Sequence, residues 1–149
     1  APASATAQTV PFSRTIDVTG VTDDGFGFLG TFELTDFFFD GFDILVSGDM
    51  SGTIDRVGPV NSQFVSIPVS VILDQQFCDL MTLAVGPATV DLAGRVNLDR
   101  VNLTLDALAA PAAVDSTQLG DLLCSISTLL PDELTGVSAI LNEVLFIFP

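Results

Sequence analysis

The sequence predicts a mainly β fold of the α+β class: a sandwich or barrel of seven or eight short strands, followed by a C-terminal pair of amphipathic helices. Two observations carry this prediction. Apolar residues recur with a period of two as far as about residue 106, interrupted by Asp-Gly and Gly-Pro turn signals, and beyond that point the period becomes helical. The chain has 149 residues, the length of one domain, so we expect a single domain over 1–149.

The N-terminal segment 1–12 carries no charge and is rich in small residues. Free tails of this composition are normally disordered. Its last residues nevertheless begin an alternating pattern in which Val10 and Phe12 share a face. We therefore expect a candidate donor strand that pairs with a sheet edge, either of its own chain or of a neighbouring copy.

The β core is expected over 13–106. Residues 26–34 alternate with large apolar side chains on one face, and the turn dipeptides Asp24-Gly25 and Asp40-Gly41 flank this segment. The longest clean alternation covers 65–73. Pro68 lies on its other face, which predicts an edge strand or a bulge there, because proline cannot donate to a sheet.

The sequence Arg-Val-Asn-Leu occurs twice, at 95–98 and at 100–103, five residues apart. An odd spacing would turn the second copy toward the opposite face of the sheet. We therefore expect a bulge near Asp99 that restores the same face to both copies.

A helical pair is expected over 116–147, after an Ala/Pro-rich linker at 107–114. Apolar residues recur at helical spacing in both halves of this segment. Ser116 is the expected N-cap of the first helix, and Pro131 ends it. The tail contains Phe146 and Phe148 and is too apolar to be left in water.

Composition excludes several classes of function. The chain has 4 Lys+Arg, all of them arginine, against 19 Asp+Glu, and its net charge is −15; it contains no Lys, His, Tyr or Trp. His-dependent catalytic triads, His-ligated metals and lysine-based chemistry are therefore absent. Binding to nucleic acid is not expected, because it requires a cationic face. Paired carboxylates are the only acid–base chemistry left, and we expect no enzyme.

The compartment is predicted from the start of the chain and from its cysteines. The sequence begins without a methionine or a signal peptide, as a mature secreted chain would. Two cysteines, Cys78 and Cys124, form a single bridge in an exported protein and are buried thiols in a cytosolic one. No segment has the length of apolar residues that a membrane helix requires, so we expect no transmembrane segment.

Several motifs in the second half of the chain occur in a fixed order. The run Cys-Asp-Leu-Met-Thr-Leu-Ala-Val-Gly-Pro covers 78–87, Val-Asn-Leu-Asp-Arg-Val-Asn-Leu covers 96–103, and Leu-Gly-Asp-Leu-Leu-Cys covers 119–124. In these motifs, and in Gly-Thr-Phe-Glu-Leu at 30–34 and Met-Ser-Gly-Thr at 50–53, the chain resembles a group of uncharacterised exported bacterial proteins, mostly from high-GC organisms. The chain departs from the group's usual P-G-x-G-N turn at 112–116. The resemblance implies export and a Cys78–Cys124 bridge between strand region and helix, and it implies no activity.

The abundant aspartates raise the question of calcium. Asp23 and Asp24 lie in one Asp-Gly turn, and Asp40 and Asp43 in another, so both turns carry oxygen ligands that calcium accepts. Neither turn matches the EF-hand loop. The favoured interpretation is that these aspartates hydrogen-bond their own backbone, with calcium as the alternative and no other cofactor expected.

Three consecutive phenylalanines, Phe37, Phe38 and Phe39, cannot all face the same side of a strand. They indicate either a bulge that feeds the core or an exposed apolar patch for a partner. Together with the apolar residues of both termini they form the candidate assembly set: Val10, Phe12, Phe37, Phe38, Phe39, Phe146 and Phe148.

These observations predict a secreted, non-catalytic structural or adhesive protein whose partners are copies of itself. We expect the N-terminal strand to link subunits of an extracellular filament or surface layer. The alternative is an extracellular binding module for an apolar or carbohydrate ligand, held between the Phe-rich strands and the helices. A groove lined by Phe26, Phe28 and Phe32 would favour binding, and a filled interior would favour assembly.

Overall fold

The computed structural model describes residues 8–73, 76–92, 94–130 and 132–148. These residues form nine strands, a short 3₁₀ helix and two α-helices. Their bounds are β1 Gln8–Pro11, β2 Thr15–Thr22, β3 Gly27–Phe39, β4 Ile44–Ile54, β5 Gly58–Leu73, β6 Leu80–Val85, β7 Ala88–Asp91, β8 Arg95–Leu98, β9 Val101–Asp106, η1 Ala107–Ala109, α1 Ser116–Leu129 and α2 Leu134–Ile147.

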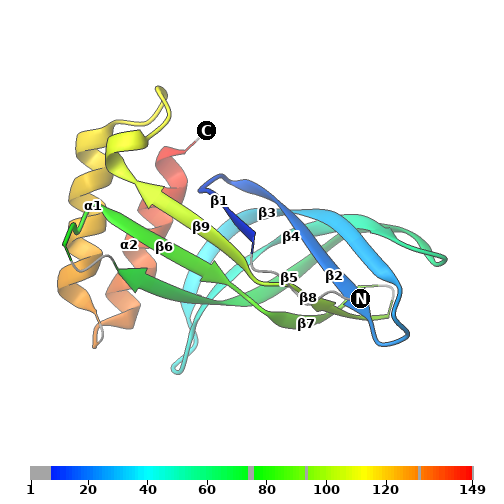
Figure 1. Ribbon diagram of the computed structural model, residues 1–149. Coiled ribbons are helices and arrows are strands. Elements are labelled where there is room, and N and C mark those ends of the chain that lie inside the picture. The colour runs from blue at the N-terminus through cyan, green and yellow to red at the C-terminus, as the bar shows by residue number, and fades with distance from the viewer. Residues whose placement is uncertain (1–7, 74–75, 93, 131, 149) are drawn as a thin grey trace.

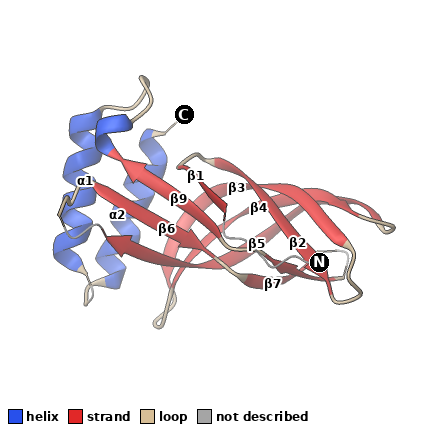
Figure 2. Cartoon of the chain, viewed as in Figure 1, coloured by secondary structure: helices blue, strands red, loops and turns tan. Residues whose placement is uncertain are grey.

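All nine strands belong to one curled sheet, in the order β1-β9-β6-β5-β4-β3-β2-β8-β7. Figure 2 shows the helices together at one end of this sheet. The mainly β, α+β prediction is confirmed. The strands differ from it in number and length, since β3, β4 and β5 have 13, 11 and 16 residues. They continue through irregularities in register, between Leu34 and Asp36 in β3 and between Met50 and Gly52 in β4.

The sheet curls because the two arms of the 80–106 hairpin change neighbours midway. Near the helices, β6 pairs with β5 and β9 pairs with β6. Farther along the same arms, β8 pairs with β2 and β7 pairs with β8. The hairpin thus joins both sides of the β2–β5 sheet (Figure 1). A side-chain hydrogen bond adds a contact between β5 and the residue after β7: Gln63 Nε2 donates to the Leu92 carbonyl oxygen at 2.9 Å.

The irregularity expected near Asp99 separates β8 from β9. The backbone N–H of Asp99 donates to the Thr19 carbonyl oxygen at 2.9 Å, and Asp99 Oδ2 accepts from Thr19 Oγ1 at 2.8 Å. Valine and leucine of both Arg-Val-Asn-Leu copies are buried: Val96, Leu98, Val101 and Leu103. The break therefore keeps one face of the hairpin apolar on either side of it.

The prediction of an edge strand or a bulge at Pro68 is wrong. Strand β5 lies between β4 and β6, and at Pro68 it stays in register with Leu45 of β4. The Pro68 carbonyl oxygen accepts from Gly86 N–H at 2.8 Å, at the point where β6 ends. Proline is tolerated here because the residue opposite its missing N–H is Gly86, which lies beyond the end of β6.

The first helix begins as expected, but its cap is Asp115 and not Ser116. Asp115 Oδ1 accepts from the backbone N–H of Thr117 at 2.9 Å and of Gln118 at 3.2 Å. A carboxylate at this position also suits the positive end of the helix dipole. Both helices then bury one apolar face against each other and against the sheet: Leu119, Leu123, Ile126, Val137, Leu141, Val144 and Leu145.

A side-chain amide joins α2 to the edge of β3. Strand β2 begins opposite Glu33, so none of the described strands pairs with the later part of β3 on that side. There, Asn142 Oδ1 accepts from Phe37 N–H at 2.6 Å, and Asn142 Nδ2 donates to the Phe37 carbonyl oxygen at 2.8 Å. Asn142 thus takes the place of a neighbouring strand residue and satisfies both backbone groups of Phe37.

The Cys78–Cys124 disulfide is present and joins the segment before β6 to α1. The two cysteines are separated by 46 residues in the sequence. In the chain-entropy description, a cross-link that closes a loop of this length stabilises the fold by about 4 kcal/mol, because it restricts the unfolded chain. The bridge therefore holds the helical pair near the hairpin that closes the sheet.

The Asn142 contact predicts a stability change. Replacing Asn142 with alanine leaves two part-buried backbone groups of Phe37 unpaired, so Asn142→Ala should lose about 1–3 kcal/mol of unfolding free energy in urea. Glu143→Gln, at the exposed neighbouring position, is the matched control and should change it by less than about 0.5 kcal/mol. Equal stabilities of the two variants would contradict the proposed role of Asn142.

The disulfide gives a second prediction. The double variant Cys78→Ala, Cys124→Ala should unfold at a lower urea concentration, with a loss of about 2–4 kcal/mol. The unmodified chain, denatured without reductant, should show no thiol that reacts with a chromogenic thiol reagent. Two reactive thiols, or a double variant as stable as the parent chain, would be the opposite result.

Candidate functional site

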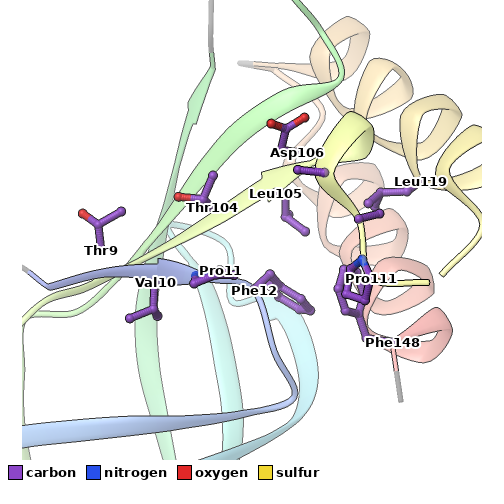
Figure 3. Close-up of a pocket in the computed structure, with 12 residues that line it drawn as sticks. Thr9, Val10, Pro11, Phe12, Thr104, Leu105, Asp106, Pro111, Leu119 and Phe148 are labelled. Carbon is purple, nitrogen blue, oxygen red and sulfur yellow. The ribbon is translucent and has the colours of Figure 1, made fainter. Parts of the chain in front are cut away.

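An apolar groove lies where β1, the end of β9, η1 and α1 meet (Figure 3). Its volume is about 530 Å³, and its lining is Thr9, Val10, Pro11, Phe12, Thr104, Leu105, Asp106, Ala109, Ala110, Pro111, Leu119 and Phe148. We call this the β1–η1 groove. Nine of these twelve residues are apolar, and the volume falls within the range of small-molecule sites.

The floor of the groove is formed by two phenylalanines that lie far apart in the sequence, Phe12 and Phe148. Phe12 follows β1 and Phe148 follows α2, and their exposed fractions are 4% and 5%. Their ring centroids lie 4.7 Å apart at an interplanar angle of 65°, a favourable edge-to-face contact. Leu105 and Leu119 are buried beside them. The floor is therefore fixed by contacts between segments that are far apart in the sequence.

Strand β1 forms one wall, at an edge of the sheet. It pairs in parallel with β9, whereas every other strand pair is antiparallel in the part of the chain that the structure describes. Phe12 N–H donates to the Thr104 carbonyl oxygen at 3.0 Å, so alternate residues of β1 turn their backbone groups outward. Pro11 is one of these, and it has no N–H to offer another strand.

The structure brings together three residues of the predicted assembly set. Val10, Phe12 and Phe148 all line the β1–η1 groove. Residues 8–12 of the candidate donor segment are described and include β1, which pairs with β9 of the same chain; the rest of that segment, 1–7, lies outside the described residues.

The other members of the assembly set lie elsewhere. Phe37 is buried under α2, and Phe38 and Phe39 are half-buried after the irregularity in β3. This placement matches the interpretation of a bulge that feeds the core. Phe146 is 85% exposed on α2 and borders a second, smaller groove of about 380 Å³ with Leu122 and Ile147.

The groove that would have favoured ligand binding between the Phe-rich strands and the helices does not form. Phe28 and Phe32 are 2% and 0% exposed and belong to the core, and Phe26 is half-buried. The guanidinium of Arg56 lies 5.8 Å from the centre of the Phe26 ring, a cation–π contact. The interior of the curled sheet is therefore filled along these strands.

The aspartates considered for calcium lie in two separate turns. Asp23 and Asp24 precede β3, and Asp40 and Asp43 follow it, so a strand of 13 residues, roughly 40 Å long, separates them. Asp23 Oδ1 accepts from Asn97 Nδ2 at 3.1 Å, and its Oδ2 lies 3.8 Å from Arg95 Nε. Over the described ranges, no three His, Cys, Asp or Glu side chains come together as a metal site would require.

Sequence analysis missed the other walls of the groove. Residues 107–114 were expected to be only a linker, yet Ala109, Ala110 and Pro111 line the groove and Asp106 begins η1 by accepting from Leu108 N–H at 3.0 Å. A local signal for the cap existed, since aspartate two residues before an N–H favours such a turn. No local signal places this linker beside β1.

Comparisons of the chain with protein-family models, with curated proteins and with solved structures find no match. The resemblance to exported bacterial proteins therefore stays a prediction. Among the described residues, no helix is both long and apolar enough to cross a membrane.

Asp40 is held in its charged form by its own turn. Its Oδ1 accepts from the backbone N–H of Asp43 and of Phe42, each at 2.8 Å. These two bonds, with that of Asp43 the larger cause, lower the pKa of Asp40 below its ordinary value of 3.8. The carboxylate thus serves the turn between β3 and β4, as the backbone-bonding interpretation expects.

The turn at Asp40 predicts a pH dependence. Its folded pKa lies below the unfolded value of 3.8, so the stabilisation is present above pH 3.8 and is lost as the pH falls through the folded pKa. An NMR titration of the Asp40 carboxyl carbon should give a midpoint below 3.8, and Asp40→Asn should flatten the stability profile in that acidic range. A midpoint at or above 3.8 would rule out this role.

Proposed function

We propose that this chain is a secreted, non-catalytic structural or adhesive domain that associates with copies of itself by exchanging β1. In this arrangement, β1 of one subunit pairs with β9 of the next and places Phe12 against the Phe148 of that neighbour. The proposal rests on how β1 is attached. In the described part of the chain, β1 is a short edge strand that is hydrogen-bonded on one side only, to β9. Phe12, which follows β1, is buried and anchors it.

The energetics of exchange favour this interpretation. Exchange replaces each contact of β1 by the same contact made to another copy, so its net free energy is set mainly by the connection and by concentration. Only Ser13 and Arg14 connect the exchanged Phe12 to β2, and a short hinge of this kind favours swapping between subunits. Successive head-to-tail exchange gives an open filament when the rotation between neighbouring copies does not close a ring, and the filament is the form that we propose.

Competing modes of assembly and activity receive less support. Addition of a foreign strand to the outer edge of β1 would meet Pro11, which has no N–H to donate. Catalysis would have to rely on carboxylates, since the sequence lacks histidine, lysine and tyrosine. Export is supported by the Cys78–Cys124 bridge, because disulfides persist in oxidising compartments.

A cysteine trap tests whether β1 pairs within or between chains. Thr9 and Asn102 are partners in the β1–β9 register, so their Cα atoms lie at a separation that a disulfide can bridge. After mild oxidation, the double variant Thr9→Cys, Asn102→Cys should give a ladder of covalent multimers in non-reducing electrophoresis. Each bond would then join β1 of one chain to β9 of another.

The matched control uses two strands that do not exchange. Thr82 and Thr104 are partners between β6 and β9, inside the closing hairpin, so Thr82→Cys, Thr104→Cys should give covalent monomers only. Covalent monomers from both double variants would show that β1 pairs within its own chain, and the proposed exchange would be wrong.

A further inference from the structure

We infer that the β1–η1 groove is a binding site for an uncharged, apolar small molecule. This inference goes beyond self-association and does not rest on it, because the groove has the same walls whether β1 comes from its own chain or from a neighbour.

The groove lies beside a packed core and has a larger volume than the Phe146 groove. Four elements and the C-terminal Phe148 surround about 530 Å³, while the inward faces of the strands are packed. Its floor of Phe12, Leu105 and Phe148 is buried and apolar. The apolar surface still exposed to water lies on the walls, at Pro11, Ala109 and Pro111. An apolar molecule that covers these residues gains about 25 cal/mol for each Å² of apolar surface that it buries.

Charge determines the class of molecule. Among the described residues that line the groove, Asp106 alone is ionisable, and its Oδ1 already accepts from Leu108 N–H. None of the four arginines lines it, and the whole chain carries a net charge of −15. An anionic headgroup would meet no counter-charge and an unfavourable field. A cationic group would have to leave water for an apolar floor, which is costly without a partner there.

The groove offers few hydrogen-bonding partners for the backbone of a bound peptide. Figure 3 shows the polar atoms of Thr9, Thr104 and Asp106 directed away from the cluster of Phe12, Pro111 and Phe148. A bound peptide segment would bring backbone groups that need partners, and Pro11 removes a donor from the adjacent strand edge. A compact apolar molecule makes no such demand, so it fits this lining better than a segment of another chain.

Two dyes of similar shape and different charge test the inference on the full chain. N-phenylnaphthylamine is uncharged, and anilinonaphthalene sulfonate carries a sulfonate on the same ring system. The protein has no Trp or Tyr, so the dye fluorescence is observed without emission from those residues. We expect saturable binding of one N-phenylnaphthylamine per chain, with an affinity at least tenfold higher than that of the sulfonate.

A pair of neighbouring substitutions assigns the binding to the groove. Ala109 lines it, so Ala109→Phe should fill part of the space and weaken binding of the uncharged dye at least tenfold. Leu108 is 86% exposed and is not part of the lining, so Leu108→Phe should leave the affinity unchanged. Both positions belong to η1 at the surface, and equal urea midpoints for the two variants would show that the fold is retained.

Three results would overturn the inference. Equal affinities for the two dyes would indicate general binding to exposed apolar side chains. An affinity unaffected by Ala109→Phe would place the dye elsewhere, with the Phe146 groove the first position to examine. Loss of dye binding as the protein concentration rises would assign the β1–η1 groove to a second copy of the chain.

Discussion

The change of partners along the 80–106 hairpin is the constraint on which the rest of the fold depends. One arm pairs with β5 near the helices, and the other pairs with β2 farther away, so the hairpin spans both sides of the β2–β5 sheet. The breaks at Gly86-Pro87 and at Asp99 allow this without turning the apolar face outward. A chain that is 48% hydrophobic thereby acquires an enclosed interior.

The helical pair completes the end of the interior that the curled sheet leaves open. Asn142 replaces a strand at the edge of β3, and the Cys78–Cys124 bridge connects α1 to the hairpin. At the end of α2, Phe148 contacts Phe12, which follows β1. The β1–η1 groove lies at this junction, where residues of β1, η1 and the linker line the same space.

Local patterns were sufficient to predict the fold class, the break near Asp99 and the two helices. Each depends on side-chain periodicity, which reflects which face of an element is buried. Side-chain periodicity did not predict the full length of a strand where polar or small residues lie inside it. Serine and glycine are common in turns, yet Ser47 and Gly48 lie inside β4, where a Cβ at Gly48 would collide with the Glu33 carbonyl group. The N-cap was misplaced by one residue because Asp115 and Ser116 are both good caps.

The candidate site was predicted only in part. Val10, Phe12 and Phe148 were singled out because they are apolar residues at the two ends of the chain, and the groove brings them together. The parallel pairing of β1 with β9 joins residues about ninety positions apart, and no periodicity in either strand specifies such a partner. Phe37 was predicted with them but is buried, because the irregularity in β3 and the Asn142 amide direct that segment into the core.

The molar mass of the native protein shows whether the chain associates with copies of itself through β1, as we propose. Light scattering over a wide dilution series should give multiples of 15.6 kDa for the full chain. A chain that begins at residue 13, with the same far-ultraviolet circular dichroism per residue, should stay monomeric throughout, because it lacks the strand to be exchanged. A monomeric mass for the full chain at every concentration would contradict the account.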